Sequence, residues 1–201
     1  MRKVRTVASV AGLPSEVYGP GNITWWGALG GEIIEGFVII LGLFAYFYLR
    51  HIAPTWPPLH TRLPSLGVPI LNLVLMFISV VPAWLASRAA KVEDRFMTLI
   101  WLIVHGLLGT AIVVVRYFEF FALNVRWDAN VYGSLNWALL FAHGYTAVFD
   151  VMDTLGLALL FFVLEPEQKH YVDVTENSFF WYFVVITWIP LFVLIFLSPR
   201  W

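Results

Sequence analysis

The chain has 201 residues, of which 60% are hydrophobic and 12% are charged, and its mean hydropathy is +0.80. This composition excludes an ordinary soluble globular domain and indicates an integral membrane protein. The formal net charge of −1 offers no basic surface for nucleic acid, and a sequence without cysteine excludes disulfides, zinc–thiolate sites and iron–sulfur clusters.

Five apolar stretches are long enough to cross about 30 Å of hydrocarbon as helices. In chain order they are residues 25–49, 68–86, 96–122, 132–164 and 179–197. Residues 1–22 are expected to form a polar tail, whose Gly- and Pro-containing end does not resemble a removable signal peptide. We predict an all-α integral membrane protein, with a single membrane domain that is a bundle of five transmembrane helices.

The distribution of Lys and Arg among the loops predicts the orientation of the bundle. With the N-terminus in the cytoplasm, seven of these residues fall on the cytoplasmic side and four on the other side. Cytoplasmic loops of membrane proteins are enriched in Lys and Arg. The count therefore favours an N-in/C-out arrangement.

The first predicted span, residues 25–49, contains two glutamates, Glu32 and Glu35. Their separation of three residues places them on one helix face, and nearby glycines allow that face to approach another helix closely. An acid inside a membrane is costly unless it faces protein, is paired or is protonated. Two interpretations remain open: a structural pair, or carboxyls that handle protons or regulate a partner's proton path.

The third predicted span, residues 96–122, contains Arg116 and Glu119 at the spacing of an intrahelical ion pair. We expect this pair to be structural. His105 in the same span is expected to be a core histidine with its hydrogen bonds satisfied.

Four polar residues of the fourth predicted span, residues 132–164, lie along one slowly drifting stripe, and they are His143, Thr146, Asp150 and Asp153. Because lipid cannot satisfy a polar stripe, it must contact another polar helix or water. The stripe is equally consistent with a proton relay and with inter-helix packing. We group its charged members and its histidine with Arg116 and Glu119 as an intramembrane polar network.

Sequence strings in all five spans resemble those of a known family. They are WWGALGGEIIEGFVIILGLFAYFYLRHIAPTWPP, VPILNLVLMFISVVPAW, LLGTAIVVVRYFEF, VYGSLNWALLFAHGYTAVFD and WYFVVITW. In this order, the chain resembles subunit III of the cytochrome c oxidase (haem–copper oxidase) family. The resemblance is to a divergent member of the short five-helix bacterial form, which lacks the first two helices of the long form.

The chain departs from the family pattern at several positions where the family has a polar residue. They include Arg116, Thr146, Tyr182 and Val185. The family commonly has Gln at the first of these positions, His at the next two and Asp at the last. Asp150 and Asp153 are additions to the pattern. Glu35 is the nearest counterpart of the family's internal glutamate.

The resemblance implies a non-catalytic subunit of a respiratory terminal oxidase, in a complex that reduces oxygen and pumps protons. It further implies packing against the catalytic subunit I and contact with subunit II. Haem and copper would belong to those partner subunits, so that this chain would bind no metal, and structural phospholipid would bind between its helices. The expected location is the cytoplasmic membrane of a bacterium or archaeon.

Three alternatives come from other interpretations of the same residues. The first is a subunit-III-like protein associated with a nitric oxide reductase. The second is a small transporter or channel that uses Asp150 and Asp153, and the third is a membrane anchor that holds haem between His105 and His143.

Overall fold

A computed structural model describes residues 17–201, and the predicted tail lies largely outside the described residues. Within residues 17–201 the chain is all-α, and its long helices are α1 (Ile23–Ile52), α2 (Gly67–Lys91), α3 (Arg95–Ala122), α4 (Val131–Val163) and α5 (Gln168–Phe192). All five are long and apolar enough to cross a membrane. The predicted fold class, a membrane protein with five spanning helices, is confirmed.

Short polar side chains determine where three of the helices begin. The side-chain oxygens of Asn22, Asp94 and Asn130 accept hydrogen bonds from backbone N–H groups in the first turns of α1, α3 and α4. The first backbone N–H groups of a helix have no partner within the helix, so such caps stabilise its start. At each of these places the cap separates a turn from an apolar run.

The last helix begins earlier than the sequence predicted, at Gln168 instead of residue 179. The additional turns are polar, but several of their side chains point into the protein. Ser178, for example, donates through its hydroxyl to the carbonyl oxygen of Ala83 on α2. The hydropathy pattern placed this segment in a loop because it does not show which polar residues face other helices. After Phe192 the helix continues as a π-helical turn, Val193–Leu197, and a 3-10 turn, Ser198–Arg200.

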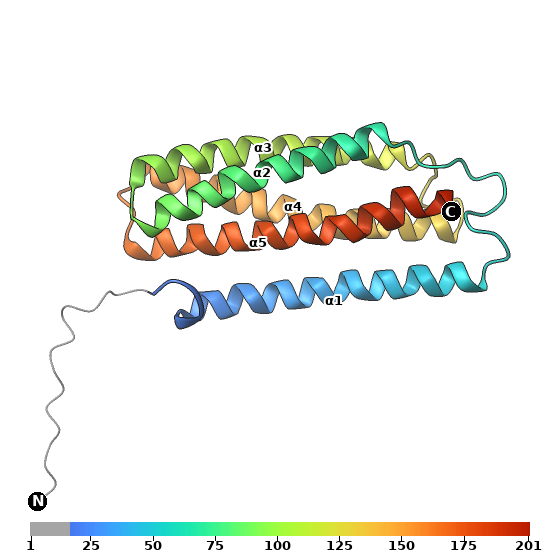
Figure 1. Ribbon diagram of the computed structural model, residues 1–201, viewed down its shortest axis with the longest axis horizontal. Coiled ribbons are helices and arrows are strands. Elements are labelled where there is room, and N and C mark those ends of the chain that lie inside the picture. The colour runs from blue at the N-terminus through green and yellow to red at the C-terminus, as the bar shows by residue number, and fades with distance from the viewer. Residues whose placement is uncertain (1–16) are drawn as a thin grey trace, which may run out of the picture.

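Helices α2 to α5 form the main bundle, and α1 lies along one side of it (Figure 1). In the bundle α2 packs on α3 and α5, while α4 packs on α3 and α5. The most apolar eighteen residues of α1 are 11% buried, compared with 50% for the last span. Helix α1 contacts α4 and α5, and most of its surface is left for lipid or a partner.

The loop between α1 and α2 closes one end of the molecule. The Trp56 ring lies between Tyr46 of α1 and Tyr132 of α4, at 5.2 Å from each ring centroid. The backbone N–H of Ser65 donates to the carbonyl oxygen of Ala122 at the end of α3. At the opposite end, the Tyr18 hydroxyl donates to the carbonyl oxygen of Ala90 at the end of α2. The start of α1 and Trp201 therefore lie at opposite ends of the bundle, and the N-in/C-out orientation stays a prediction (Figure 1).

Glycine has different roles in two of the helices, which allows a test of the packing. At Gly133 of α4 an added Cβ would collide with the backbone carbonyl oxygen of Arg126, whereas at Gly27 of α1 it would meet nothing within 4 Å. We expect Gly133→Ala to lower the free energy of unfolding by about 1–3 kcal/mol, because backbone cannot move aside as a side chain can. Denaturant titration in mild detergent, followed by circular dichroism, measures this loss.

Gly27→Ala is the matched control and should be neutral or slightly stabilising, since alanine favours the helix. If the two substitutions changed the free energy of unfolding equally, the close approach of the Arg126 carbonyl oxygen to α4 would be contradicted.

Candidate functional site

The residues of the predicted polar network fall into two groups at different places along the bundle. Arg116, Glu119 and His143 belong to a cluster in the centre of α2 to α5. Asp150 and Asp153 line a cavity between α1, α4 and α5 instead. The polar network expected from the sequence is therefore divided between two sites.

The first group, here called the arginine cluster, consists of Asn72, Arg116, Glu119, His143 and Trp188. Nη1 of Arg116 lies 2.5 Å from Oε2 of Glu119, and the Asn72 side-chain amide donates to the same oxygen at 3.0 Å. The guanidinium carbon of Arg116 lies 3.6 Å from the Trp188 ring centroid. These contacts join α2, α3 and α5 through one buried cation.

The protonation of His143 follows from its two partners. Nη2 of Arg116 lies 3.1 Å from Nδ1 of His143, and Nε2 of His143 lies 2.9 Å from the carbonyl oxygen of Val184. A guanidinium can only donate and a carbonyl can only accept. The neutral histidine therefore accepts at Nδ1 and donates from Nε2, and it connects α3, α4 and α5 through one ring.

The arginine cluster has the properties of a structural site. Its charges are buried and paired, which is the condition under which ionised groups are tolerated inside a membrane. Both nitrogens of His143 are already in use. Asn72 and Trp188 were not predicted to belong to the polar network, although an amide within an apolar span was a usable signal.

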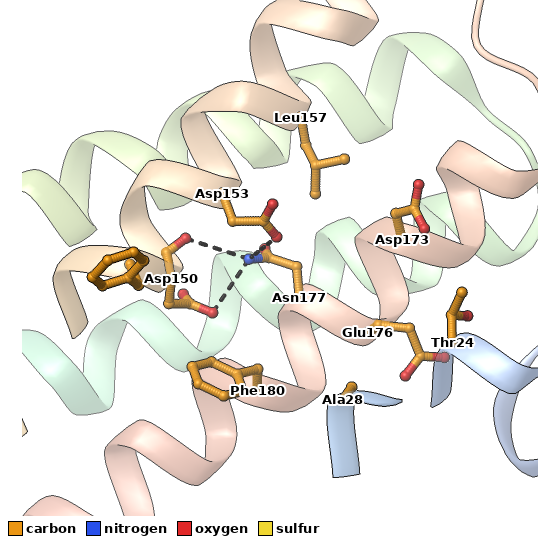
Figure 2. A pocket seen from close by; sticks show the side chains of 10 residues that line it. Thr24, Ala28, Asp150, Asp153, Leu157, Asp173, Glu176, Asn177 and Phe180 are labelled. Atoms are coloured by element: carbon orange, nitrogen blue, oxygen red, sulfur yellow. Dashed lines mark hydrogen bonds between the residues drawn. The ribbon is translucent and has the colours of Figure 1, made fainter. Parts of the chain in front are cut away.

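The second group, here called the acidic cavity, is a space of about 420 Å³ between α1, α4 and α5. Its carboxylates are Asp150 and Asp153 on α4 and Asp173 and Glu176 on α5 (Figure 2). The rest of its lining, mostly apolar, comes from Thr24, Ala28, Phe149, Leu157, Asn177 and Phe180. The cavity lies near the end of the bundle at which α1 and α5 begin.

One amide organises the two aspartates of the cavity. Nδ2 of Asn177 donates to Oδ1 of Asp150 and to Oδ2 of Asp153, each at 3.2 Å (Figure 2). Oδ1 of Asn177 accepts from the Thr154 hydroxyl at 2.9 Å. This second bond fixes which end of the amide faces the carboxylates. Asn177 therefore holds two carboxyl groups at a defined place between α4 and α5.

The two glutamates of α1 face this region. Glu32 is buried within electrostatic range of Glu176, and the half-buried Glu35 is within electrostatic range of Asp150. Each has a buried oxygen without a hydrogen-bond partner, Oε1 of Glu32 and Oε2 of Glu35, among the residues that the structure describes. The structure therefore places the glutamates of α1 on the side that faces the acids of α4 and α5, an arrangement that was not predicted from the sequence.

Glu35 also borders an apolar groove of about 300 Å³ between α1 and α4. The groove is lined by Val38, Ile39, Phe141, Ala142, Tyr145 and Thr146 as well as Glu35. It suits a hydrocarbon chain, and Glu35 is the acidic residue in its lining.

Two other residues differ from what the sequence suggested. Glu176 belongs to the acidic cavity but was missed, because the polar start of α5 was placed outside the membrane span. The expectation that His105 is satisfied is wrong within the described chain: both ring nitrogens are buried without a hydrogen-bond partner, and the ring packs edge-on against Trp181. Over residues 17–201, no three His, Asp or Glu side chains are grouped as metal ligands.

Similar proteins were found along most of the chain, although no protein-family model matches it. The chain is 27% identical over 163 residues to cytochrome c oxidase subunit 3 of the cyanobacterium Synechocystis. The aligned region covers 79% of this chain and 69% of that protein. The protein of the same name from Thermostichus vulcanus is 26% identical over 79% of this chain and 80% of its own length. That of the baboon Papio hamadryas is 28% identical over 82% of this chain and 66% of its own length.

The chain is a divergent relative of the cytochrome c oxidase subunit 3 proteins. The resemblance predicted from its sequence strings is confirmed. It spans about two thirds of the length of the baboon and Synechocystis proteins and four fifths of the Thermostichus one. The chain is accordingly a multi-pass membrane protein related to a respiratory oxidase subunit.

Glu119→Ala tests the arginine cluster. The substitution leaves the buried guanidinium of Arg116 without its carboxylate, so we expect the free energy of unfolding to fall by about 3 kcal/mol or more. Denaturant titration of the protein in mild detergent measures this loss.

The matched control is Asp128→Ala, which removes the partner of Arg126 in an ion pair at 2.7 Å on the surface. An exposed pair is worth less than about 1 kcal/mol. If both substitutions cost the same, the buried pair does not hold α2 to α5 together.

Proposed function

We propose that this chain is the non-catalytic subunit III of a respiratory terminal oxidase of the cytochrome c oxidase type. The observation that carries the proposal is the similarity to subunit 3 proteins over about four fifths of the chain. In this role the chain packs on subunit I, contacts subunit II, binds phospholipid and sustains proton uptake during oxygen reduction.

The redox centres belong to the partner subunits in this proposal. Haem and copper supply the electron transfer and oxygen chemistry there, and this chain binds none of them. In support, the intramembrane histidine His143 is held by Arg116 and by the Val184 carbonyl, so haem ligation would require both contacts to break. This geometry argues against the haem-carrying anchor considered from the sequence.

Glu35 is the residue through which the chain acts on proton uptake. Its carboxyl belongs to the lining of the apolar groove, has one unpartnered oxygen, and is within electrostatic range of Asp150 in the acidic cavity. Glu32, three residues earlier, extends the row of carboxyls toward Glu176. A carboxyl placed in this way can take up and release a proton without first breaking an ion pair.

Structural phospholipid occupies the apolar groove between α1 and α4. The groove is lined almost entirely by carbon atoms, which suits the carbons of an acyl chain. Bound lipid would hold α1, the least buried helix, against the main bundle. The location proposed is the cytoplasmic membrane of a bacterium or archaeon, with N-in/C-out orientation, so that the acidic cavity opens on the side of proton uptake.

Glu35→Ala tests the proposed role in proton uptake. We expect the haem spectra of the purified complex to stay unchanged, while proton pumping or the number of turnovers before inactivation falls. A positioned proton-transfer group contributes about a hundredfold to the step that it serves, so the effect should be well resolved. Proton release from vesicles containing the complex, together with oxygen-consumption traces, measures both quantities.

Glu165→Gln, at an exposed site between α4 and α5, is the matched control and should leave both quantities unchanged. Unchanged pumping and lifetime in Glu35→Ala would leave that glutamate a structural role only.

The acidic cavity specifically favours a second candidate function, a small transporter or channel built on Asp150 and Asp153. Isolation from native membranes in mild detergent separates the two. We expect the tagged chain to bring a haem-bearing partner with it, visible in the absorption spectrum. A stable assembly without haem would contradict the oxidase proposal and support the transporter, whereas a nitric oxide reductase as the partner would identify the other respiratory branch.

A further inference from the structure

The polar lining of the acidic cavity is predominantly acidic. Four carboxylates, Asp150, Asp153, Asp173 and Glu176, line one space of about 420 Å³, and no Lys, Arg or His is among its described lining residues. Thr24 from the first turn of α1 completes the polar part of the wall (Figure 2). Asp173 and Glu176 lie in the first turns of α5, whereas Asp150 and Asp153 lie deeper in the bundle, in the second half of α4.

Two of these carboxylates have buried oxygens that lack a donor. Asp150 is 3% exposed and its Oδ2 has no hydrogen-bond partner, and Glu176 is 8% exposed and its Oε2 has none, among the residues from 17 onward. The single amide of Asn177 is divided between Asp150 and Asp153. A buried carboxylate oxygen without a donor is unfavourable. The site thus offers carboxyl oxygens to a ligand that brings hydrogen-bond donors.

The shape and chemistry of the wall select the kind of cation. No three of the described acids are grouped closely enough to coordinate a metal ion, so donors that reach separate carboxylates fit better. Phe149 and Phe180 add aromatic rings to the lining, and Ala28 and Leu157 add aliphatic surface. Aromatic faces attract organic cations, and a cavity of this size holds an ammonium group together with the carbons attached to it.

We propose that the acidic cavity between α1, α4 and α5 is a binding site for a primary ammonium group. The ammonium is presented either by the headgroup of an aminophospholipid or by a soluble amine. It donates hydrogen bonds to carboxyl groups that line the cavity, among them Asp150 on α4 and Glu176 on α5. The inference goes beyond the oxidase proposal, because it requires no partner subunit. It also rests on two acids, Asp150 and Asp153, that the subunit III pattern lacks.

The first experiment uses the unmodified chain in the assembly in which it purifies, delipidated in mild detergent. Native mass spectrometry measures binding of dioleoylphosphatidylethanolamine, of its N-acetylated derivative and of dioleoylphosphatidylglycerol. We expect phosphatidylethanolamine to bind at least about tenfold more tightly than the other two, because only its headgroup has the charged donor. Putrescine is the soluble probe. If putrescine binds and the protein shows no preference among the three lipids, the ligand is a soluble amine.

The second experiment removes the carboxylates one at a time. Asp150→Asn and Glu176→Gln should each weaken binding of the preferred amine by about tenfold, since each loses a charged acceptor. Glu165→Gln, an exposed acid outside the cavity, is the control and should bind as the wild type does. The helical circular dichroism of each variant shows that it has folded, and the lipid comparison on the unmodified chain needs no variant.

Two results would overturn the inference. One is that no amine is recognised: neither phosphatidylethanolamine nor putrescine binds, or phosphatidylethanolamine binds no better than its N-acetylated form and putrescine does not bind. The other is amine binding that folded Asp150→Asn and Glu176→Gln variants both retain at full strength. Either result leaves the oxidase proposal standing, because that proposal is decided by co-purification with a haem-bearing partner.

Discussion

Polar and ionised side chains inside a membrane have to face protein, and this constraint determines how the helices of this chain are rotated against one another. The guanidinium of Arg116 can lie in the centre only where Glu119 and His143 face it. The aspartates of α4 face Asn177 of α5 in the same way, one turn apart. A rotation of α4 that exposed either set to lipid would lose the contacts of both, so the two groups define a single orientation of that helix.

The same constraint explains how α1 can be well placed although little of it is buried. Its buried side chains are Glu32, Ile39 and Tyr46, spaced along the face that turns toward α4 and α5. Tyr46 is held at one end by a hydrogen bond of 2.8 Å to the Ser198 hydroxyl and by the Trp56 ring. Near the other end, Trp25 stacks on Phe179 of α5 at 6.1 Å. Contacts at both ends therefore align the helix, while its middle stays open beside the groove and the carboxyls.

The sequence predicts the helices because runs of apolar residues of spanning length have few other interpretations, and it predicts the family through short strings in order. It does not predict which polar residues meet, since the spacing along one helix says nothing about the rotation of its neighbour. Arg116 and Glu119 could be paired from their spacing, but Asn72 comes from another helix. Asp150 and Asp153 could be placed on one face, but their partner Asn177 lies in a polar segment that hydropathy placed outside the membrane.

The fixed tautomer of His143 limits the paths that charge can take through the protein. A histidine that relays a proton must accept at one nitrogen and release from the other, then turn or re-tautomerise to repeat the cycle. Here acceptance is blocked by an arginine donor and release is directed at a helix carbonyl. The ring therefore cannot relay protons through the middle of the bundle while both of these hydrogen bonds are in place. A proton path along the carboxyls beside α1, as the proposed function has it, would therefore bypass the interior of the other four helices.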